Sequence, residues 1–324
     1  MINKNFLNNF LKVLLVLLIL IAIIGVCIFI YAIFTDTKIE QIFPFLNKKE
    51  KTRQEFSTLF TEETYPKVDG STATIPLSES YKKAFTGDSS ATVKHNTTHN
   101  AYVNLINKDV DLILVTSPSD EELKLAKEAN IGLNVEPVVN EGFVFFVNEK
   151  NPVQSLTVEQ IQKIYSGEIT NWKDVGGDDA EIKAYQREPN SGSQTGMISL
   201  VMKNKKLMEA PKEDIIEGMM AILGVVSDYD NGKYSIGYSY YYYTNTMYDD
   251  IDSNVVDRIR LLKVNGVEPN DETIKNGTYP FRTNYYIVTN TATDSKSEIQ
   301  KLKNAMLSDI GQQIAKEAGY VPLR

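Results

Sequence analysis

The stretch that decides the fold runs from residue 186 to residue 196 and reads Gln186-Arg187-Glu188-Pro189-Asn190-Ser191-Gly192-Ser193-Gln194-Thr195-Gly196. The residues before it predict a strand and the apolar run after it predicts a helix. Hydroxyl side chains at such a turn cap helices, and the free N–H groups of a helix N-terminus attract small anions. Arg187 lies four residues before Ser191 and can donate two parallel hydrogen bonds to the same anion. Taken alone, the stretch is more typical of an ordinary capped surface turn.

The same order of strand, hydroxyl-rich turn and helix recurs upstream, at residues 66–85, 93–106 and 110–130. Consecutive units of this kind predict a parallel sheet in which the carboxyl ends of the strands converge. Open α/β sheets bind ligands at that edge, so hydroxyl groups in the turns are candidate ligand contacts. The candidates in these turns are Ser71, Thr72, Thr98 and Thr116.

Composition narrows the class of protein. The chain has 324 residues, ordinary globular composition and a net charge of −8, divided into +3 for residues 1–55 and −11 for the remainder. An acidic domain argues against nucleic acid as a partner, because binding to the phosphate backbone needs clustered Lys and Arg. The only cysteine, Cys27, lies in an apolar run, so the rest of the chain forms no disulfide and has no thiol chemistry.

Residues 13–34 contain no charged side chain and are mostly Leu, Ile and Val. Such a run is long enough to cross a bilayer as one helix, and we expect a single-pass membrane anchor there. Residues 1–12 would then be a short cytoplasmic tail and residues 35–65 a spacer. Lipidation of Cys27 is not expected, because Val26 stands where a small residue would be needed. Basic residues flank the run on both sides, so charge alone does not fix the orientation.

Several motifs follow one another in an order that is specific in combination. They are Gly70-Ser71-Thr72, Asn151-Pro152-Val153, Ser166-Gly167-Glu168-Ile169-Thr170-Asn171-Trp172, Arg187 with Ser191-Gly192-Ser193, Ile236-Gly237-Tyr238, Gly277-Thr278-Tyr279-Pro280-Phe281-Arg282 and Gly319-Tyr320-Val321-Pro322-Leu323. In this order, over residues 66–324, the chain resembles the PstS-like phosphate-binding solute receptors of ABC importers.

The resemblance implies an α/β fold of the type II periplasmic-binding-protein class, with two lobes joined by crossing strands. Each lobe would be a mainly parallel sheet with flanking helices. Lobe I would comprise residues 66–141 and 244–324, and lobe II residues 142–243. The implied function is capture of inorganic phosphate, or a related oxyanion, in the cleft between the lobes. The implied partner is an ABC permease, and the binding domain would lie outside the cytoplasm. We expect a monomer without a cofactor.

The resemblance also implies roles for individual residues. Arg187 matches the arginine that pairs with the anion, and Ser71 and Thr72 match the first-lobe loop. The second-lobe donors are matched by Ser191, Gly192 and Ser193. Two departures bear on the ligand: Thr116 stands where the family commonly has an aspartate that accepts a proton from phosphate, and Thr97-Thr98-His99 replaces Gly-Ser-Gly. The sequence therefore indicates oxyanion binding and leaves the identity of the anion open.

Two other classes of function were weighed against a binding protein. An enzyme would need a base beside Ser191 or Ser193, yet the only histidines are His95 and His99 and no G-x-S-x-G turn is present. The two histidines are spaced like a helical zinc pair, but no third ligand is evident, so neither catalysis nor a metal site is expected. The remaining alternative is a membrane-anchored sensor or surface interaction protein that keeps a diverged PstS-like fold without transport.

Overall fold

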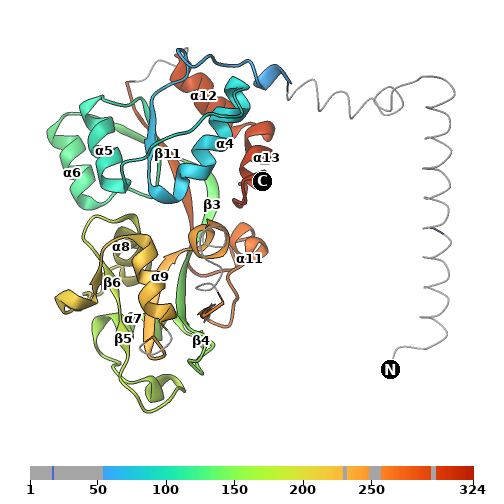
Figure 1. The fold of residues 1–324 in the computed structure, drawn as a ribbon. Helices are drawn as coiled ribbons and strands as arrows, with labels where there is room; N and C mark the ends of the chain where they lie inside the picture. The colour runs from blue at the N-terminus through green and yellow to red at the C-terminus, as the bar shows by residue number, and fades with distance from the viewer. Residues whose placement is uncertain (1–16, 18–53, 229–231, 248–256, 293–296) are drawn as a thin grey trace. The chain divides into compact units, whose positions relative to one another are not determined.

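The structure, a computed structural model, describes residue 17 and residues 54–228, 232–247, 257–292 and 297–324 (Figure 1). The chain divides into two compact units, Met1–Phe56 and Ser57–Arg324. Apart from residue 17, the anchor predicted at residues 13–34 lies outside the described residues, as do the predicted tail and the spacer up to residue 53. Within the described part of the chain, no helix is both long enough and apolar enough to cross a membrane.

The first lobe is built around two short parallel strands, β1 (Val68–Gly70) and β2 (Leu112–Val115), with Gly70 opposite Leu114. Three helices accompany them, namely α4 (Ile75–Thr86), α5 (Thr98–Asn107) and α6 (Asp120–Glu128). A capping box between Ser119 and Glu122 starts α6. The strand expected at residues 93–95 is absent. Directly after this segment, the backbone and side-chain amides of Asn96 donate to the Asp69 carboxylate, so side-chain bonds hold the chain here in place of a strand ladder.

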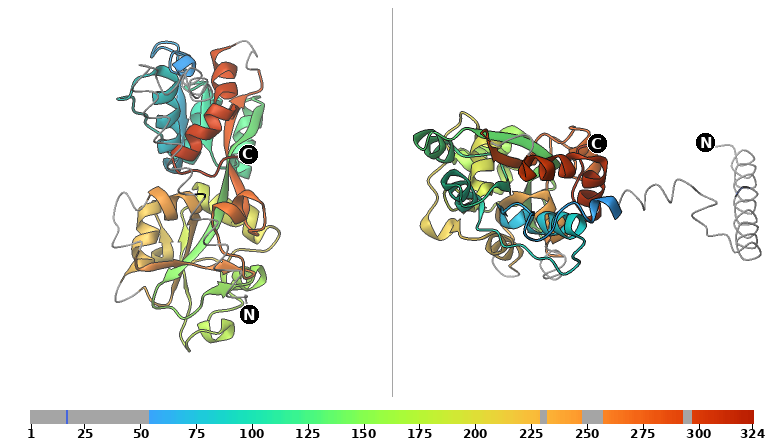
Figure 2. Two further views of the ribbon diagram at one scale, coloured as in Figure 1. Left: turned by 90° about the vertical axis from the view of Figure 1, so that its right-hand side faces the viewer. Right: turned by 90° about the horizontal axis from the view of Figure 1, so that it is seen from above.

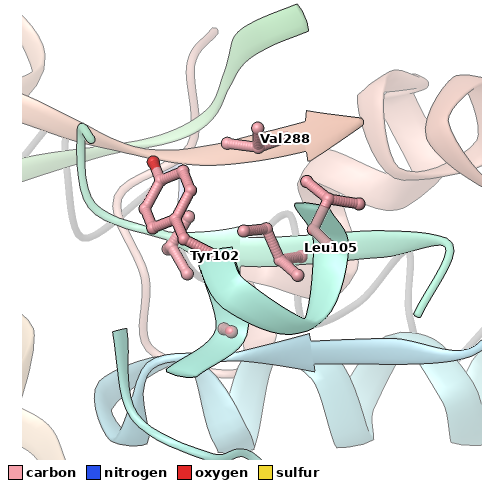
Figure 3. Packing of buried hydrophobic residues seen from close by; sticks show 6 residues of the cluster. Tyr102, Leu105 and Val288 are labelled. Carbon is pink, nitrogen blue, oxygen red and sulfur yellow. The ribbon is translucent and has the colours of Figure 1, made fainter. Parts of the chain in front are cut away.

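A buried cluster fixes α5 against the sheet (Figure 3). Tyr102 and Leu105 project from α5 onto β2 and onto Val288 of β11 (Arg282–Asn290). These contacts follow from the helical spacing of apolar residues along α5, which gives the helix one apolar face. Because α5 is held in this way, its first turn, which begins at Thr98, has a fixed position at the end of β2.

Strand β3 (Leu133–Asn148) joins the two lobes (Figure 2). Its first part pairs antiparallel with β11, up to Gly142 opposite Arg282. From Phe143 onward it pairs antiparallel with β8 (Ser235–Tyr240). One strand therefore belongs to both lobes, as expected for a hinge made of crossing strands.

The sheet is mixed, and the prediction of mainly parallel sheets is wrong. Among the described residues it has seven strands, which follow the path β1-β2-β11-β3-β8-β5, with β9 (Ile259–Leu261) paired to β3; β5 is Lys183–Ala184. Only β1/β2 and β5/β8 are parallel pairs, whereas β2/β11, β11/β3, β3/β8 and β3/β9 are antiparallel. The reason is that β3 and β11 carry the chain between the lobes in opposite directions, so each runs against its neighbours.

The second lobe has a core of aromatic side chains, in which Phe145 contacts both Tyr165 and Tyr238. Its helices are α7 (Val158–Ser166), α8 (Gly192–Gly196), which continues as a π-helical segment Met197–Met202, and α9 (Met219–Ser227). Thr157 caps α7 through a capping box with Gln160. Strand β6 (Gln186–Arg187) lies just before the turn that leads into α8. It forms a separate parallel pair with β7 (Ile215–Ile216), which comes later in the chain.

The chain after residue 256 does not return directly to the first lobe. Strand β9 (Ile259–Leu261) pairs with the second part of β3, and β10 (Lys263–Val264) pairs with β4 (Ser155–Leu156). The short helix α11 (Asp271–Lys275) precedes β11, and α12 (Glu298–Leu307) and α13 (Asp309–Glu317) follow it.

Candidate functional site

We define the first-lobe loops as residues 71–74, 97–99 and 116. The first of these segments begins where β1 ends. The amide of Ser71 donates to the Leu114 carbonyl at 3.0 Å, and the Thr74 hydroxyl donates to the same oxygen at 2.7 Å. Gly70 is required here, because a Cβ atom would lie 2.3 Å from that carbonyl oxygen and 2.8 Å from the His95 ring. The loop is therefore seated directly on β2.

A half-buried histidine and a buried aspartate brace this loop from behind. His95 Nδ1 donates to the Ser71 carbonyl at 2.9 Å, and burial lowers the pKa of the ring, which favours its neutral form. The Asp69 carboxylate accepts bonds from the Gly70 and Asn96 amides at 2.7 Å and from Asn104 at 2.8 Å. Neither residue was predicted to have this bracing role, and the sequence carries no short-range signal for it, since Asp69 and His95 are far apart along the chain.

Thr98 and Thr116 complete the first-lobe loops. Thr98 is the first residue of α5, and Thr116 directly follows β2, where the Tyr102 hydroxyl donates to its carbonyl at 2.8 Å. Both side chains are buried. The Thr116 hydroxyl has no hydrogen-bond partner among the described residues. An unpaired buried hydroxyl is costly, and Thr116 lines the cavity between the loops, which indicates a place for a ligand atom or a water molecule there.

The second-lobe loop, defined as residues 187–193, carries the fixed charge. Arg187 ends β6 and is 3% exposed. Its Nε donates to the Ile216 carbonyl at 2.9 Å, its Nη1 to the Ser193 hydroxyl at 3.2 Å, and its Nη2 to the Glu188 carboxylate at 2.8 Å. Ser191 caps α8, since its hydroxyl accepts from the Gln194 amide at 3.1 Å. The guanidinium group is thus held in one position before any ligand arrives.

A cavity of about 300 Å³ lies between these loops. All eight predicted site residues line it, namely Ser71, Thr72, Thr98, Thr116, Arg187, Ser191, Gly192 and Ser193. His99, Glu188, Tyr240 and Tyr285 also line it. The last three are not among the predicted site residues. Glu188 is adjacent to Arg187, which was an available signal. Tyr240 and Tyr285 lie on β8 and β11, and no local pattern pointed to them.

The loops of the two lobes are in close contact across the cavity. A Cβ atom on Gly192 would lie 2.8 Å from the hydroxyl oxygens of both Thr98 and Thr116. Asn190 donates to the Glu121 carboxylate at the start of α6 at 2.7 Å. The structure therefore has the lobes closed on each other at this cavity.

The charge balance of the site is nearly neutral. Arg187 and Glu188 form an ion pair, and most of the other lining side chains are hydroxyl groups. His99 Nδ1 lies 3.2 Å from the Glu122 carboxylate, whose pKa is raised by burial. Such a set offers many donors around one cation, which suits a small anion more than a large charged ligand.

The geometry also bears on the enzyme and metal hypotheses. The Ser191 and Ser193 hydroxyls accept from the Gln194 amide and from Arg187, while His95 and His99 contact Ser71 and Glu122. Over the ranges that the structure describes, neither histidine is bonded to either serine. In the same ranges, no three His, Cys, Asp or Glu side chains are placed to hold a metal ion.

Comparisons with known proteins agree with this fold. A family model described as the PBP superfamily domain matches residues 61–308. The phosphate-binding protein PstS of Staphylococcus saprophyticus is 28% identical over 271 residues, which cover 79% of this chain and 80% of that protein. The PstS protein of Borreliella burgdorferi is 28% identical over 187 residues, covering 57% of this chain and 64%, less than two thirds, of its own length.

Two solved structures share the architecture. A phosphate ABC transporter substrate-binding protein from Clostridium perfringens, with bound phosphate, has a TM-score of 0.60 at 24% identity and covers 79% of this chain and 98% of its own. An ABC-type phosphate transport receptor from Vibrio cholerae has a TM-score of 0.58 at 21% identity and covers 78% and 98%. At these sequence identities, the similarity to the two structures shows the fold alone, which is a two-lobed mixed α/β structure.

Proposed function

The chain belongs to the PBP superfamily, and from this premise we propose that it captures inorganic phosphate or a related oxyanion in the cavity between its lobes, for delivery to an ABC importer. The proposal rests on one observation: the buried Arg187 guanidinium group and hydroxyl groups from both lobes line the same cavity. The relatives named above are phosphate-binding proteins, which supports the choice of phosphate as the first ligand to test.

The donors in the cavity are sufficient for useful affinity. A charge-assisted hydrogen bond contributes about 1.5–3 kcal/mol and a neutral one about 1 kcal/mol. Two contacts from Arg187 and several from hydroxyl and amide groups can therefore supply the roughly 8 kcal/mol that a micromolar dissociation constant requires. Because Arg187 is already held by Ile216 and Ser193, little side-chain entropy is lost on binding.

The experiment that tests this site is isothermal titration of the full-length chain with phosphate, arsenate and sulfate. We expect Arg187→Ala to weaken phosphate binding by at least about tenfold, the loss of roughly one charge-assisted bond. Arg324→Ala is the matched control, because Arg324 is exposed and pairs with Asp309 at the C-terminus. Equal affinity of the Arg187→Ala variant and the wild type would refute the site.

We also propose a division into lobes that follows the pairing of strands. Residues 66–141 and 282–324 would form lobe I, and residues 142–281 lobe II, since β9 and β10 pair with strands of the second lobe. Ligand binding would close the lobes about β3 and β11. Small-angle scattering with and without phosphate tests this closure. Phosphate binding without any change in radius of gyration would favour the alternative of a sensor or surface protein.

For residues 13–34 we propose a single-pass anchor, with the binding domain outside the cytoplasm and near its permease. The proposal is supported by the length of the uncharged run, which matches the thickness of a bilayer. Protease digestion of intact cells tests it: the domain should be cleaved from the outside, while residues 1–12 stay protected. Release of the full chain by carbonate washing would contradict the anchor.

A further inference from the structure

Glu141 lies where β3 changes its pairing partner. Up to Gly142 the strand pairs with β11, and from Phe143 onward it pairs with β8. The register of β11 also shifts between Tyr285 and Tyr286, beside this point. Rotation of two lobes must be absorbed by a few residues in the crossing strands, and the change of partner places Glu141 among them.

The Glu141 carboxyl group is 1% exposed and has no cationic partner among the described residues. Its Oε1 accepts hydrogen bonds from the Gly142 amide at 2.8 Å and from the Tyr242 amide at 3.2 Å. Burial raises the pKa of this carboxyl to about 8, against the opposing effect of those bonds. Such a group exchanges its proton within a physiological range of pH.

The titratable groups that face Glu141 come from every neighbouring element. They are Tyr240 on β8, Tyr241 and Tyr242 after it, Tyr285 on β11 and Tyr320 near the C-terminus. The nearest basic residue in the strand register is Arg282, opposite Gly142, but its side chain is exposed and donates to Asn140. An ionised Glu141 would therefore be surrounded by phenols and amides, without a countercharge.

These tyrosines connect Glu141 to the loops on both sides of the cavity. The Tyr242 ring stacks on Tyr320 at 3.6 Å, and the Tyr320 hydroxyl donates to the Ala73 carbonyl in the first-lobe loops at 2.6 Å. On the other side, the Tyr240 hydroxyl donates to Gly192 in the second-lobe loop. Tyr285 lines the cavity and lies beside the Glu141 carboxyl. One or two tyrosine rings thus separate the Glu141 carboxyl from the first-lobe loops and from the second-lobe loop.

We propose that Glu141 is a positioning residue of the hinge and that its protonation is coupled to closure of the lobes on an anion, so that binding takes up a proton at Glu141. The inference rests on the anion-binding function proposed above. An ionised Glu141 would place a second negative charge behind Tyr285, and charges repel strongly across a poorly solvated interior. Anion binding therefore favours the protonated carboxyl, and by reciprocity the proton favours anion binding.

The test is isothermal titration of the full-length chain with inorganic phosphate at pH 8, in two buffers of different ionisation enthalpy. This measures protons exchanged per phosphate bound. If phosphate raises the pKa of Glu141 by about one unit, the wild type takes up about 0.4 protons more per phosphate than Glu141→Gln does. Subtracting the proton uptake of the variant from that of the wild type removes the contribution of phosphate's own ionisation. Glu136→Gln is the matched control, because Glu136 lies on the same strand but is half-exposed and paired with Lys303.

The affinities should change in the same direction. We expect Glu141→Gln to bind phosphate about three- to tenfold more tightly than the wild type at pH 9 and within about twofold at pH 6, since one unit of pKa corresponds to a factor of ten. Glutamine keeps the oxygen that accepts from Gly142 and Tyr242, so a purely structural role would leave this pH dependence unchanged.

A measurement on the wild type alone covers the case in which Glu141→Gln does not fold. In protein labelled with ¹³C at glutamate carboxyl carbons, the resonance that titrates near pH 8 should move to a higher midpoint when phosphate is added. An unchanged midpoint, or equal proton uptake by wild type and Glu141→Gln, overturns the role of Glu141 and leaves the binding function intact. Absence of phosphate binding in every variant and in the wild type would instead overturn the proposed function.

Discussion

The first-lobe loops and the second-lobe loop face each other across one cavity, yet their polar groups are held in different ways. In the second-lobe loop, the Arg187 side chain is itself fixed, by Ile216, Ser193 and Glu188. In the first-lobe loops the bracing groups, His95 and the Asp69 carboxylate, hold backbone atoms. The Thr116 hydroxyl has no partner among the described residues.

This difference suggests a division of tasks between the two sides of the cavity. A charge that is fixed before binding attracts any oxyanion and contributes most of the affinity. Hydroxyl groups that can both donate and accept distinguish one oxyanion from another, because they respond to where the ligand carries its protons. Substitutions that change one side of the cavity at a time test this division.

The largest effect is expected for Gly70→Ala, which acts on the backbone under the first-lobe loops. The new Cβ atom would meet the Leu114 carbonyl oxygen at 2.3 Å, and both groups belong to paired strands that cannot easily move apart. We expect a loss of about 3 kcal/mol in the free energy of unfolding, measured by urea denaturation. Gly224→Ala in α9 is the control, since nothing lies within 4 Å of its added methyl group and a helix gains from alanine. Equal stability of the two variants would contradict the close approach.

Thr116→Val should separate binding from folding. The hydroxyl group has no partner within the described ranges, so its replacement by a methyl group of similar shape leaves the free energy of unfolding unchanged or slightly higher. Phosphate binding, measured by isothermal titration, should weaken about fivefold, the loss of about 1 kcal/mol for one neutral hydrogen bond. A variant that lost stability and kept its affinity would assign Thr116 to the scaffold.

The sequence predicted the cavity better than the sheet. All eight site residues meet at one cavity because each follows a strand or begins a helix, and those positions are readable from local patterns. The mixed sheet was missed because the direction of β11 relative to β3 depends on contacts between residues far apart in the chain. A sequence that reads as consecutive strand–helix units carries no sign that a later strand will insert between β2 and β3.

The supporting residues were missed for the same reason. Asp69 and His95 act through the backbone of Ser71 and Gly70, and Glu141 acts at a crossing that exists only after three segments assemble. No local pattern marks such residues, because the groups that they contact are identified only by the fold. Glu188 is the exception, since it directly follows Arg187 and an adjacent opposite charge was visible from the start.

The pH dependence of stability tests the brace behind the first-lobe loops. Burial lowers the pKa of His95 in the folded chain, so the unfolded chain binds its proton more readily. The stability that neutral His95 contributes is therefore present above pH 6.5, the ordinary value, and is lost as the pH falls from there toward the lower pKa of the folded state. We expect the wild type to lose free energy of unfolding relative to His95→Gln between pH 7 and pH 5. A constant difference across this range would show that His95 titrates normally.

The smallest effect is expected at the contact that crosses the cavity on its exposed side. The Asn190 side chain donates to Glu121 at 2.7 Å, but both groups are reached by water, and exposed polar contacts contribute about 0.5 kcal/mol. Changing Asn190 would add backbone strain, because its φ is 64°, so the better variant is Glu121→Ala.

Asp120→Ala is the matched control for this last variant. Both residues lie in the first turn of α6, so both substitutions remove one negative charge and the same favourable interaction with the helix dipole. Only Glu121→Ala removes the acceptor that joins the second-lobe loop to the first lobe. We expect it to bind phosphate about twofold more weakly than Asp120→Ala, through faster dissociation measured by stopped-flow. If the two variants dissociate at the same rate, the Asn190–Glu121 bond does not hold the lobes closed, and closure depends on other contacts between the lobes, such as those of Gly192 with Thr98 and Thr116.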